Sequence, residues 1–498
     1  MRRLVILVAL LILLSSITPA LAHVSGRGFI LLLPTGLYIM GGAVVVAVSF
    51  LILALVPARF FAKLEKLQKT ITHNHIARGS LSNAVSIASL VFVLFIIYAG
   101  YYGSRDPLAN PLPIFVWSVW WIGSTYLHAL FGNVWIHLNP WTGLYRLITS
   151  RPRLKRLDGI ISYPAERVGY LPAIITFTAF AWFELVHPAP ADPTLLANVA
   201  LAYILYTFIF MFIFGEKSWL QYGETFSVFF RVISWLSPLR YSPQGSGSCK
   251  LCNPELGYLA CYECASRPGS KAVRITFPSL NLLHVGCLSM SGVAFIVLAL
   301  STVSFDGLSR TFAWLSTIGV NPLEYPGRSL LITQNTVGLL LAFAALFAAY
   351  AATLILAKIT LRIGIDTQRM LGFFIVSIVP IAFGYHFAHY LPSFMIDIQY
   401  ALKVLSDPLG MGWDILGTRN MPVIVSFLSD PAQLYAIWHT QVLVIIAAHV
   451  VAVLIAHAIA LRVVVGVKKA MLSQLSMLAL MIGYTMFGLW LLSAPAIE

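Results

Sequence analysis

Residues 442–461 read VLVIIAAHVVAVLIAHAIAL, an apolar run that is interrupted only by His449 and His457. A helix needs about twenty apolar residues to cross the hydrocarbon core of a bilayer. Ionisable side chains are costly at that depth, so they usually face the interior of a helix bundle and mark a site. This stretch therefore predicts a membrane-spanning helix with candidate functional residues inside it.

The same pattern covers the rest of the chain of 498 residues, which is 59% hydrophobic and only 10% charged. Because unpaired backbone polar groups cannot face lipid, this composition indicates a helical membrane protein. The predicted fold class is all-α, a polytopic transmembrane helical bundle with about ten spans after a cleavable signal peptide. We expect the spans at residues 35–57, 84–104, 113–132, 168–187, 196–214, 285–305, 331–357, 370–392, 436–461 and 472–493.

Residues 1–22 have the three parts of a secretory signal peptide. They begin with Met1-Arg-Arg3, continue as an apolar run to Leu14, and end with the small-residue motif Ala20-Leu-Ala22. Cleavage would leave His23 as the mature N-terminus.

The basic residues are divided unequally between the two sides of the predicted bundle. The predicted inner loops hold 24 of the 32 Lys and Arg residues, the outer segments hold six, and Arg2 and Arg3 complete the total. Since basic loops stay in the cytoplasm, we expect a multi-pass protein of the bacterial inner membrane with periplasmic mature termini. The formal charge of +14 then faces anionic lipid of the bilayer, and no nucleic-acid partner is expected.

The spans divide into two membrane halves of five, residues 23–214 and 285–498, separated by a cytoplasmic loop, residues 215–284. Within this loop, residues 225–236 (TFSVFFRVISWL) predict an amphipathic helix that lies at the membrane interface.

Four cysteines in the same loop form two CxxC pairs, Cys249-Lys-Leu-Cys252 and Cys261-Tyr-Glu-Cys264. Two such pairs make a tetrahedral cage of four thiolates, which is the geometry that structural Zn²⁺ prefers. The pattern predicts a zinc site that folds the loop. An iron site or a redox dithiol remains open with the same ligands.

The histidines of the second half are candidates for a second metal or for haem b. His386 and His389 are three residues apart, so they share a helix face, and His439 is expected at a similar depth near the periplasmic side. His449 and His457 lie deeper in the next span. Imidazoles in this arrangement can bind a metal or haem iron, or they can simply join helices by hydrogen bonds.

Two carboxylates are expected at the same periplasmic level. Glu184 and Asp306 each end an otherwise apolar run, and either could serve as a metal ligand or a catalytic base. Asp407 and Asp414 lie in the stretch Ser406-Asp-Pro-Leu-Gly-Met-Gly-Trp-Asp414 of the predicted outer loop, where turn formation is the simpler role.

Several stretches, in consistent order, resemble a family of bacterial membrane proteins named fenitrothion hydrolase. They are Phe131-Gly-Asn-Val-Trp135, Asn139-Pro-Trp141, Ala179-Phe-Ala-Trp-Phe-Glu184, Ser301-Thr-Val-Ser-Phe-Asp306-Gly307, Ala388-His389-Tyr390, Ser406-Asp-Pro-Leu-Gly410 and Gly483-Tyr-Thr-Met-Phe-Gly-Leu-Trp-Leu-Leu-Ser493. The resemblance implies hydrolysis of an organophosphate triester. The four-cysteine insert is a departure from the family pattern.

Two functions follow as hypotheses. The first is a metal-dependent hydrolase of lipophilic esters, with His386, His389 and His439 as ligands and Asp306 or Glu184 as ligand or base. The second is a non-catalytic transporter or electron carrier that handles a metal or haem along the histidines. The sequence has no phosphate-binding GxxxxGK[ST] loop, so ATP is not an expected partner, whereas a partner subunit is left open.

Overall fold

The computed structural model describes residues 35–64, 68–76, 80–243, 257–266 and 269–495, most of which are helical. The predicted signal peptide, His23, Cys249 and Cys252 lie outside the described residues. Nine helical segments in this described part are long and apolar enough to cross a membrane: Thr35–Leu55, Leu81–Tyr102, Pro111–Phe131, Pro193–Phe214, Met290–Ser309, Arg328–Leu361, Thr367–Ser406, Pro431–Val463 and Val467–Ser493. The chain is therefore an integral, multi-pass membrane protein.

These nine segments coincide with nine of the ten predicted spans. The fourth predicted span, residues 168–187, contains helix α10 (Leu171–Leu185) of 15 residues. At 1.5 Å per residue such a helix is about 22 Å long, which is shorter than the roughly 30 Å hydrocarbon core. Its first turn follows Gly169, which has a φ of +51°, so the chain turns sharply before the helix begins.

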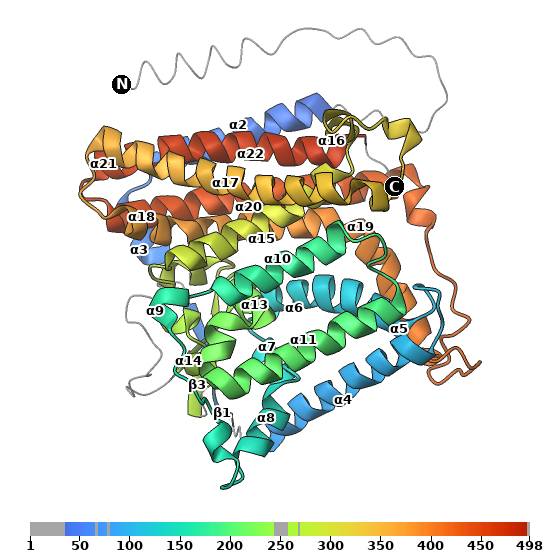
Figure 1. Ribbon diagram of the computed structural model, residues 1–498. Helices are drawn as coiled ribbons and strands as arrows, with labels where there is room; N and C mark the ends of the chain where they lie inside the picture. Colours follow the sequence, from blue (N-terminus) through green and yellow to red (C-terminus); the bar gives the residue numbers. More distant parts are fainter. Residues whose placement is uncertain (1–34, 65–67, 77–79, 244–256, 267–268, 496–498) are drawn as a thin grey trace. The chain divides into compact units, whose positions relative to one another are not determined.

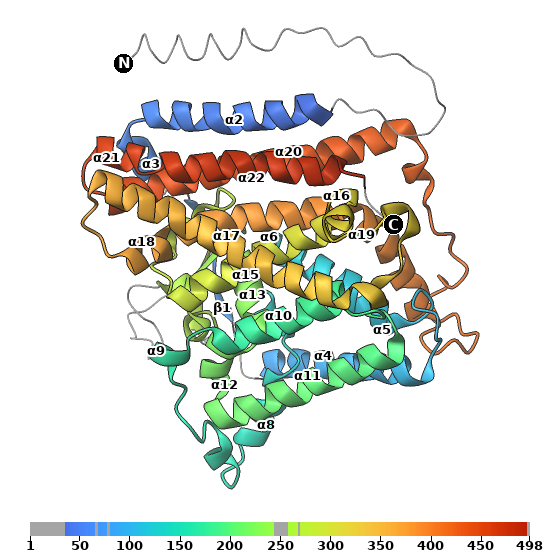
Figure 2. The same ribbon diagram turned by 45° about the horizontal axis from the view of Figure 1, so that its top comes forward.

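One group of long helices contains both ends of the described chain (Figures 1 and 2). Helix α2 packs against α20 and α22, and α15 packs against α17 and α19. At the α2–α22 contact, a Cβ on Gly42 would lie 2.6 Å from Leu489 Cδ1, so a larger residue there would require that leucine side chain to move. The helices of this group are α2 (Thr35–Leu55), α15 (Met290–Ser309), α17 (Ile332–Leu361), α19 (Val379–Ser406), α20 (Pro431–Val463) and α22 (Leu475–Ser493).

A second group contains the remaining spans. Its main contacts with the first group are those of α19 with η1 and α5 and of α15 with α10, and α10 also contacts α17. The elements of the second group are α4 (Ser80–Tyr102), α5 (Pro111–Ile114), the π-helix η1 (Phe115–Gly123), α6 (Ser124–Phe131), α8 (Thr142–Thr149), α10, α11 (Pro193–Phe214) and α13 (Thr225–Ser234).

Shorter helices connect these elements. They are α3 (Ala58–Leu64), α7 (Trp135–Leu138), α9 (Ala165–Val168), α12 (Glu216–Ser218), α14 (Tyr262–Ser266), α16 (Phe312–Thr317), α18 (Thr367–Phe374) and α21 (Val467–Leu472), together with η3 (Trp219–Gly223), η5 (Leu280–His284), η7 (Arg328–Leu331) and η8 (Ile375–Ile378).

Helix α13 corrects the prediction of an interfacial amphipathic helix at residues 225–236. The helix forms, but eight of its ten residues are buried, including the side chain of Arg231. It packs against α6 and α10, and Figure 1 shows it among the helices of the second group. The apolar face was therefore predicted well, whereas the burial of the opposite face required knowledge of the neighbouring helices.

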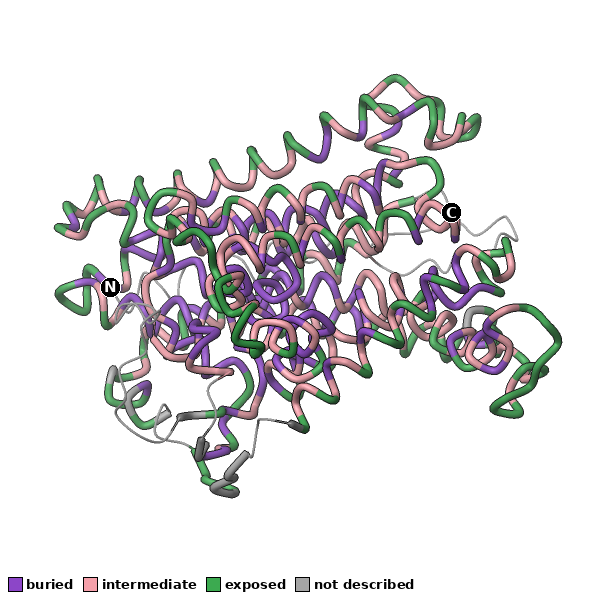
Figure 3. Tube along the Cα trace, turned by 60° about the horizontal axis from the view of Figure 1, so that its bottom comes forward, coloured by how far each residue is buried: buried purple, intermediate pink, exposed green. Residues whose placement is uncertain are grey.

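A small antiparallel sheet is an addition to the predicted all-α fold. Its strand order is β1 (Gln68–Ile76), β3 (Gly269–Thr276) and β2 (Leu239–Pro243). Gln68 pairs with Thr276, and Leu239 pairs with Ile275, so two predicted inner loops that are far apart in sequence are joined. Figure 3 shows buried residues gathered where the helices meet, with exposed residues along the outer helices and loops.

Candidate functional site

Asp306, in the last turn of α15, meets His389, which lies in the middle of α19. His389 Nε2 lies 2.7 Å from Asp306 Oδ2, and it is the donor because an ionised carboxylate only accepts. The Asp306 side chain is 2% exposed. A carboxylate in the last turn of a helix is opposed by the helix dipole, so this buried position requires partners such as His389.

Tyr390 joins this pair to Glu184 of α10. Its hydroxyl lies 2.9 Å from Asp306 Oδ2 and 3.1 Å from Glu184 Oε1. A tyrosine hydroxyl has one proton, so it can donate to only one of the two carboxyl groups at a time. If Tyr390 donates to one carboxyl group, the other carboxyl group must carry a proton of its own to donate to the tyrosine oxygen. Asp306, Glu184 and Tyr390 can therefore share protons.

Two arginines supply positive charge beside these acids. Arg310 Nη2 lies 3.4 Å from Asp306 Oδ1, an ion-pair distance, although Oδ1 accepts no hydrogen bond of good geometry. The Asp306 carboxylate raises the pKa of Arg310 above its ordinary value. Arg328 Nη1 donates to the backbone oxygen of Glu184 at 3.0 Å. The segment that follows α15 thus supplies two positive charges beside the acids of the site.

The second ring nitrogen of His389, Nδ1, does not contact the other residues of this network. The Asp306 contact uses Nε2, so Nδ1 is left as the proton acceptor, and the His389 side chain is 28% exposed. Gly307 lies beside it: a Cβ at that position would be 3.8 Å from Nδ1. The missing side chain of Gly307 leaves room next to the basic nitrogen.

His386 lies one turn before His389 and lines a small apolar cavity of about 20 Å³. Its ring centroid is 5.0 Å from that of Trp121, with the planes nearly perpendicular. His386 Nε2 and Trp121 Nε1 are both buried and have no hydrogen-bond partner among the described residues. His386 and Trp121 thus both bring a ring nitrogen without a hydrogen-bond partner to the lining of the apolar cavity.

The structure brings together Glu184, Asp306 and His389, but it gives the other predicted histidines separate partners. Nε2 of exposed His439 lies 2.9 Å from Tyr38 Oη. Buried His449 contacts the backbone oxygen of Ile445 at 2.8 Å through Nδ1, and buried His457 contacts the Gln474 amide oxygen at 3.2 Å.

The intramembrane metal or haem stays a prediction. Among the described residues, no three or more His, Cys, Asp or Glu side chains gather as a metal site would require. His389 forms a hydrogen bond with Asp306, whereas His386 lines the apolar cavity. The two imidazoles therefore do not point to a common position where both could bind one metal ion.

The CxxC pair that the structure describes anchors the inner loop to the bundle. Cys261 directly precedes α14 and Cys264 lies within it. The intervening Tyr262 donates its backbone N–H to Gln221 Oε1 at 2.6 Å, and Glu263 accepts from Lys217 Nζ at 3.0 Å. The predicted zinc clip would include Cys249 and Cys252, which are not described, and it therefore stays a prediction.

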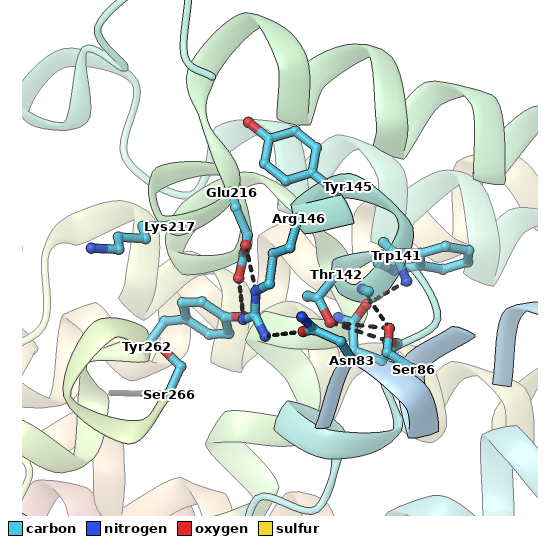
Figure 4. Close-up of polar contacts among 12 residues, drawn as sticks. Asn83, Ser86, Trp141, Thr142, Tyr145, Arg146, Glu216, Lys217, Tyr262 and Ser266 are labelled. Carbon is cyan, nitrogen blue, oxygen red and sulfur yellow. Dashed lines mark hydrogen bonds and ion pairs between the residues drawn. The ribbon is translucent and has the colours of Figure 1, made fainter. Parts of the chain in front are cut away.

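A polar network fixes the same region (Figure 4). Arg146 of α8 donates to Glu216 through Nε at 2.9 Å and through Nη2 at 2.5 Å, and the Tyr262 hydroxyl donates to Glu216 Oε1 at 3.0 Å. Arg146 Nη1 also lies 3.3 Å from Asn83 Oδ1. This two-pronged ion pair ties α4, α8, α12 and α14 together.

Asp407 and Asp414 have the turn-forming role that their sequence context predicts. Asp407 accepts from the backbone N–H groups of Met411 and Gly412, each at 2.9 Å. Asp414 accepts from Ser406 Oγ at 2.5 Å and from the Arg419 N–H at 3.0 Å.

Four residues of the site were missed by the sequence analysis: Tyr390, Arg310, Trp121 and Arg328, whose contact is to the backbone of Glu184. Tyr390 follows His389 directly, and its hydroxyl could have been suspected because buried tyrosines usually find a polar partner. Arg310 is four residues after Asp306, a spacing that places opposite charges together on a helix. Trp121 carried no sequence signal, because an aromatic residue in a predicted span most simply packs in the core.

The fold and this buried polar group define an integral membrane protein with a His–carboxylate site inside a helix bundle. Comparison of the chain with known family models, with curated proteins and with solved structures finds no match.

Proposed function

We propose that this protein is a membrane hydrolase of lipophilic esters in which His389 is the general base. The observation that carries the proposal is the Asp306–His389 contact, which orients the ring and leaves Nδ1 open beside Gly307. A carboxylate that binds one imidazole nitrogen holds the tautomer and stabilises the charged ring that forms when the other nitrogen takes a proton. The resemblance to the fenitrothion hydrolase family supports the same reaction class.

The proposed reaction needs one water molecule and one ester. His389 Nδ1 removes a proton from water as the oxygen attacks the acyl or phosphoryl centre, and the imidazolium is stabilised by Asp306. The ester bond breaks, and the proton on Nδ1 passes to the departing alkoxide or phenoxide. The products are an acid and an alcohol or phenol, and His389 returns to its neutral form.

Glu184 and Tyr390 are positioning residues in this proposal. Tyr390 contacts the same Asp306 oxygen that accepts from His389. Because Tyr390 also contacts Glu184, the protonation of Glu184 decides whether the tyrosine proton is donated to Asp306. The site lies within membrane-spanning helices, which favours substrates that enter from the lipid. A metal-assisted version of this reaction would need further ligands beside Asp306 and His389, and no cluster of three or more His, Cys, Asp or Glu side chains is found among the described residues.

The test is hydrolysis by the purified protein in lipid nanodiscs, with long-chain p-nitrophenyl esters and a p-nitrophenyl dialkyl phosphotriester as substrates. We expect H389Q and D306N each to lower the rate by about 10²–10⁴-fold, the usual contribution of a general base. H439Q is the matched control, because His439 lies apart from the site and should leave the rate unchanged. Equal rates in wild type and H389Q would refute the proposal.

Proton-coupled transport is the second candidate function, and the shared proton of Glu184, Tyr390 and Asp306 is the observation that favours it. Buried acids that exchange a proton are the usual coupling groups of membrane carriers. Measurements on proteoliposomes separate the two functions. When a solute gradient is applied, a proton-coupled carrier would change the pH of the lumen, and no ester would be cleaved.

A further inference from the structure

Helix α19 contains a proline, Pro392, one turn after Ala388 and His389. Proline has no backbone N–H, so it cannot donate the usual helical hydrogen bond to the carbonyl oxygen four residues earlier. In α19 that oxygen belongs to Ala388, which is 1% exposed. A buried carbonyl without a partner is costly inside a membrane, so a proline in a spanning helix needs a donor from a neighbouring element.

Gln441 of α20 supplies that donor. Its side-chain Nε2 donates to the Ala388 oxygen at 2.6 Å, and Gln441 is itself buried, with 8% exposed. The two helices approach closely beside this contact. A Cβ on Gly384, one turn before Ala388, would lie 2.6 Å from the Cβ of Ala448, which is two turns after Gln441 on the same face of α20. The amide of Gln441 is therefore enclosed between α19 and α20.

The carbonyl that Gln441 binds belongs to the peptide unit that joins Ala388 to His389. The ring of His389 contacts Asp306 of α15 at 2.7 Å, so this point of α19 is held from two helices, through the backbone by α20 and through the ring by α15. We propose that Gln441 is a positioning residue that sets His389 Nε2 against Asp306. The expected effect on rate rests on the proposed hydrolysis, whereas the expected effect on the His389 ring does not.

Pro392 makes a direct test possible, because P392A restores the missing backbone N–H. In P392A the Ala388 oxygen can accept the ordinary helical hydrogen bond from position 392, and the donor of Gln441 becomes dispensable. The experiment therefore compares Q441L with wild type, and P392A/Q441L with P392A, using the full-length protein in nanodiscs. Q433L is the matched control, since Gln433 is exposed on the same helix.

Two readouts follow His389. Nitrogen NMR of protein with isotope-labelled histidine reports the protonated Nε2 of His389, whose signal is identified by its loss in H389Q. We expect Q441L to shift or broaden this signal, P392A/Q441L to match P392A, and Q433L to match wild type. In p-nitrophenyl ester hydrolysis, Q441L should lower kcat by about tenfold or more and leave KM nearly unchanged, because a small displacement of the base is costly while the substrate contacts stay.

The thermal unfolding temperature of each variant shows whether it is folded. A wild-type His389 signal in folded Q441L would overturn the proposal, and so would a change caused by Q441L that is as large in the P392A background as in wild type. If the His389 signal responds as expected while wild type cleaves no ester, the proposed hydrolysis fails and the positioning role of Gln441 stands.

Discussion

At the scale of single residues, the site depends on a contact between Asp306 and His389 that no local pattern encodes. The sequence indicated both residues because each is ionisable in an apolar run, and counting spans placed both at the same end of the bundle. It could not indicate which histidine would meet the carboxylate, because that depends on how α19 is rotated about its axis. His386, one turn earlier, faces the apolar cavity instead.

His284 provides a pH test outside the spans. Burial, and then the nearby charge of Arg240, lower its pKa to about 4, against about 6.5 in an unfolded chain. Between these values the unfolded chain binds more protons, so the stability from neutral His284 is present above about pH 6.5 and is lost as the pH falls towards 4.

We therefore expect the unfolding temperature of wild type in detergent to fall more steeply than that of H284Q as the pH drops from about 6.5 to about 4. Thermal unfolding followed by circular dichroism at a series of pH values measures the difference. A constant offset between the two proteins across this window would contradict the assignment.

At the scale of elements, hydropathy predicted nine spans well because each long apolar helix carries its own signal. It did not predict the sheet, because β1, β2 and β3 are short polar segments of different loops and gain their hydrogen bonds only from one another. The short helix α10 was predicted as a span because hydropathy averages over its polar ends. The burial of α13 depended on tertiary packing in the same way.

The loop around α14 gives a prediction at this scale. If the four cysteines bind zinc, C261S/C264S should lose one equivalent of metal, and amide hydrogen exchange over residues 257–266 should become faster. C287S is the control, since Cys287 lies outside the CxxC pairs. Metal analysis and exchange mass spectrometry provide the two readouts. Unchanged zinc content in C261S/C264S would contradict the clip.

At the scale of the whole molecule, the unequal distribution of basic residues predicts the orientation of the bundle. The polar network of Arg146, Glu216 and Tyr262 lies among the predicted inner loops. Asp306 lies in the last turn of α15, at the end of that helix away from the predicted inner loop 215–284. Helix α2 packs against α20 and α22, a long-range contact that hydropathy alone could not predict.

A reporter fused after Leu259 tests this orientation. We expect a cytoplasmic signal, because the loop that contains it carries an excess of basic residues. A fusion after Gly417, in the predicted outer loop, should give the periplasmic signal. Activity of the Leu259 fusion in the periplasm would reverse the orientation and remove the argument for zinc.

In the proposed hydrolysis, the reaction takes place in the space beside His389 Nδ1. Replacing Gly307 with alanine adds a methyl group 3.8 Å from that nitrogen without a steric clash, whereas the same change at Gly483 of α22 meets open space. Alanine stabilises a helix interior by roughly 0.5–1 kcal/mol relative to glycine, so both variants should stay folded.

The decisive measurement is the rate of p-nitrophenyl ester hydrolysis by G307A relative to G483A in nanodiscs. We expect G307A to be slower by about tenfold or more, because small displacements at a reacting centre are costly, while G483A keeps the wild-type rate. Equal rates in the two folded variants would contradict a reaction in the space beside His389 Nδ1.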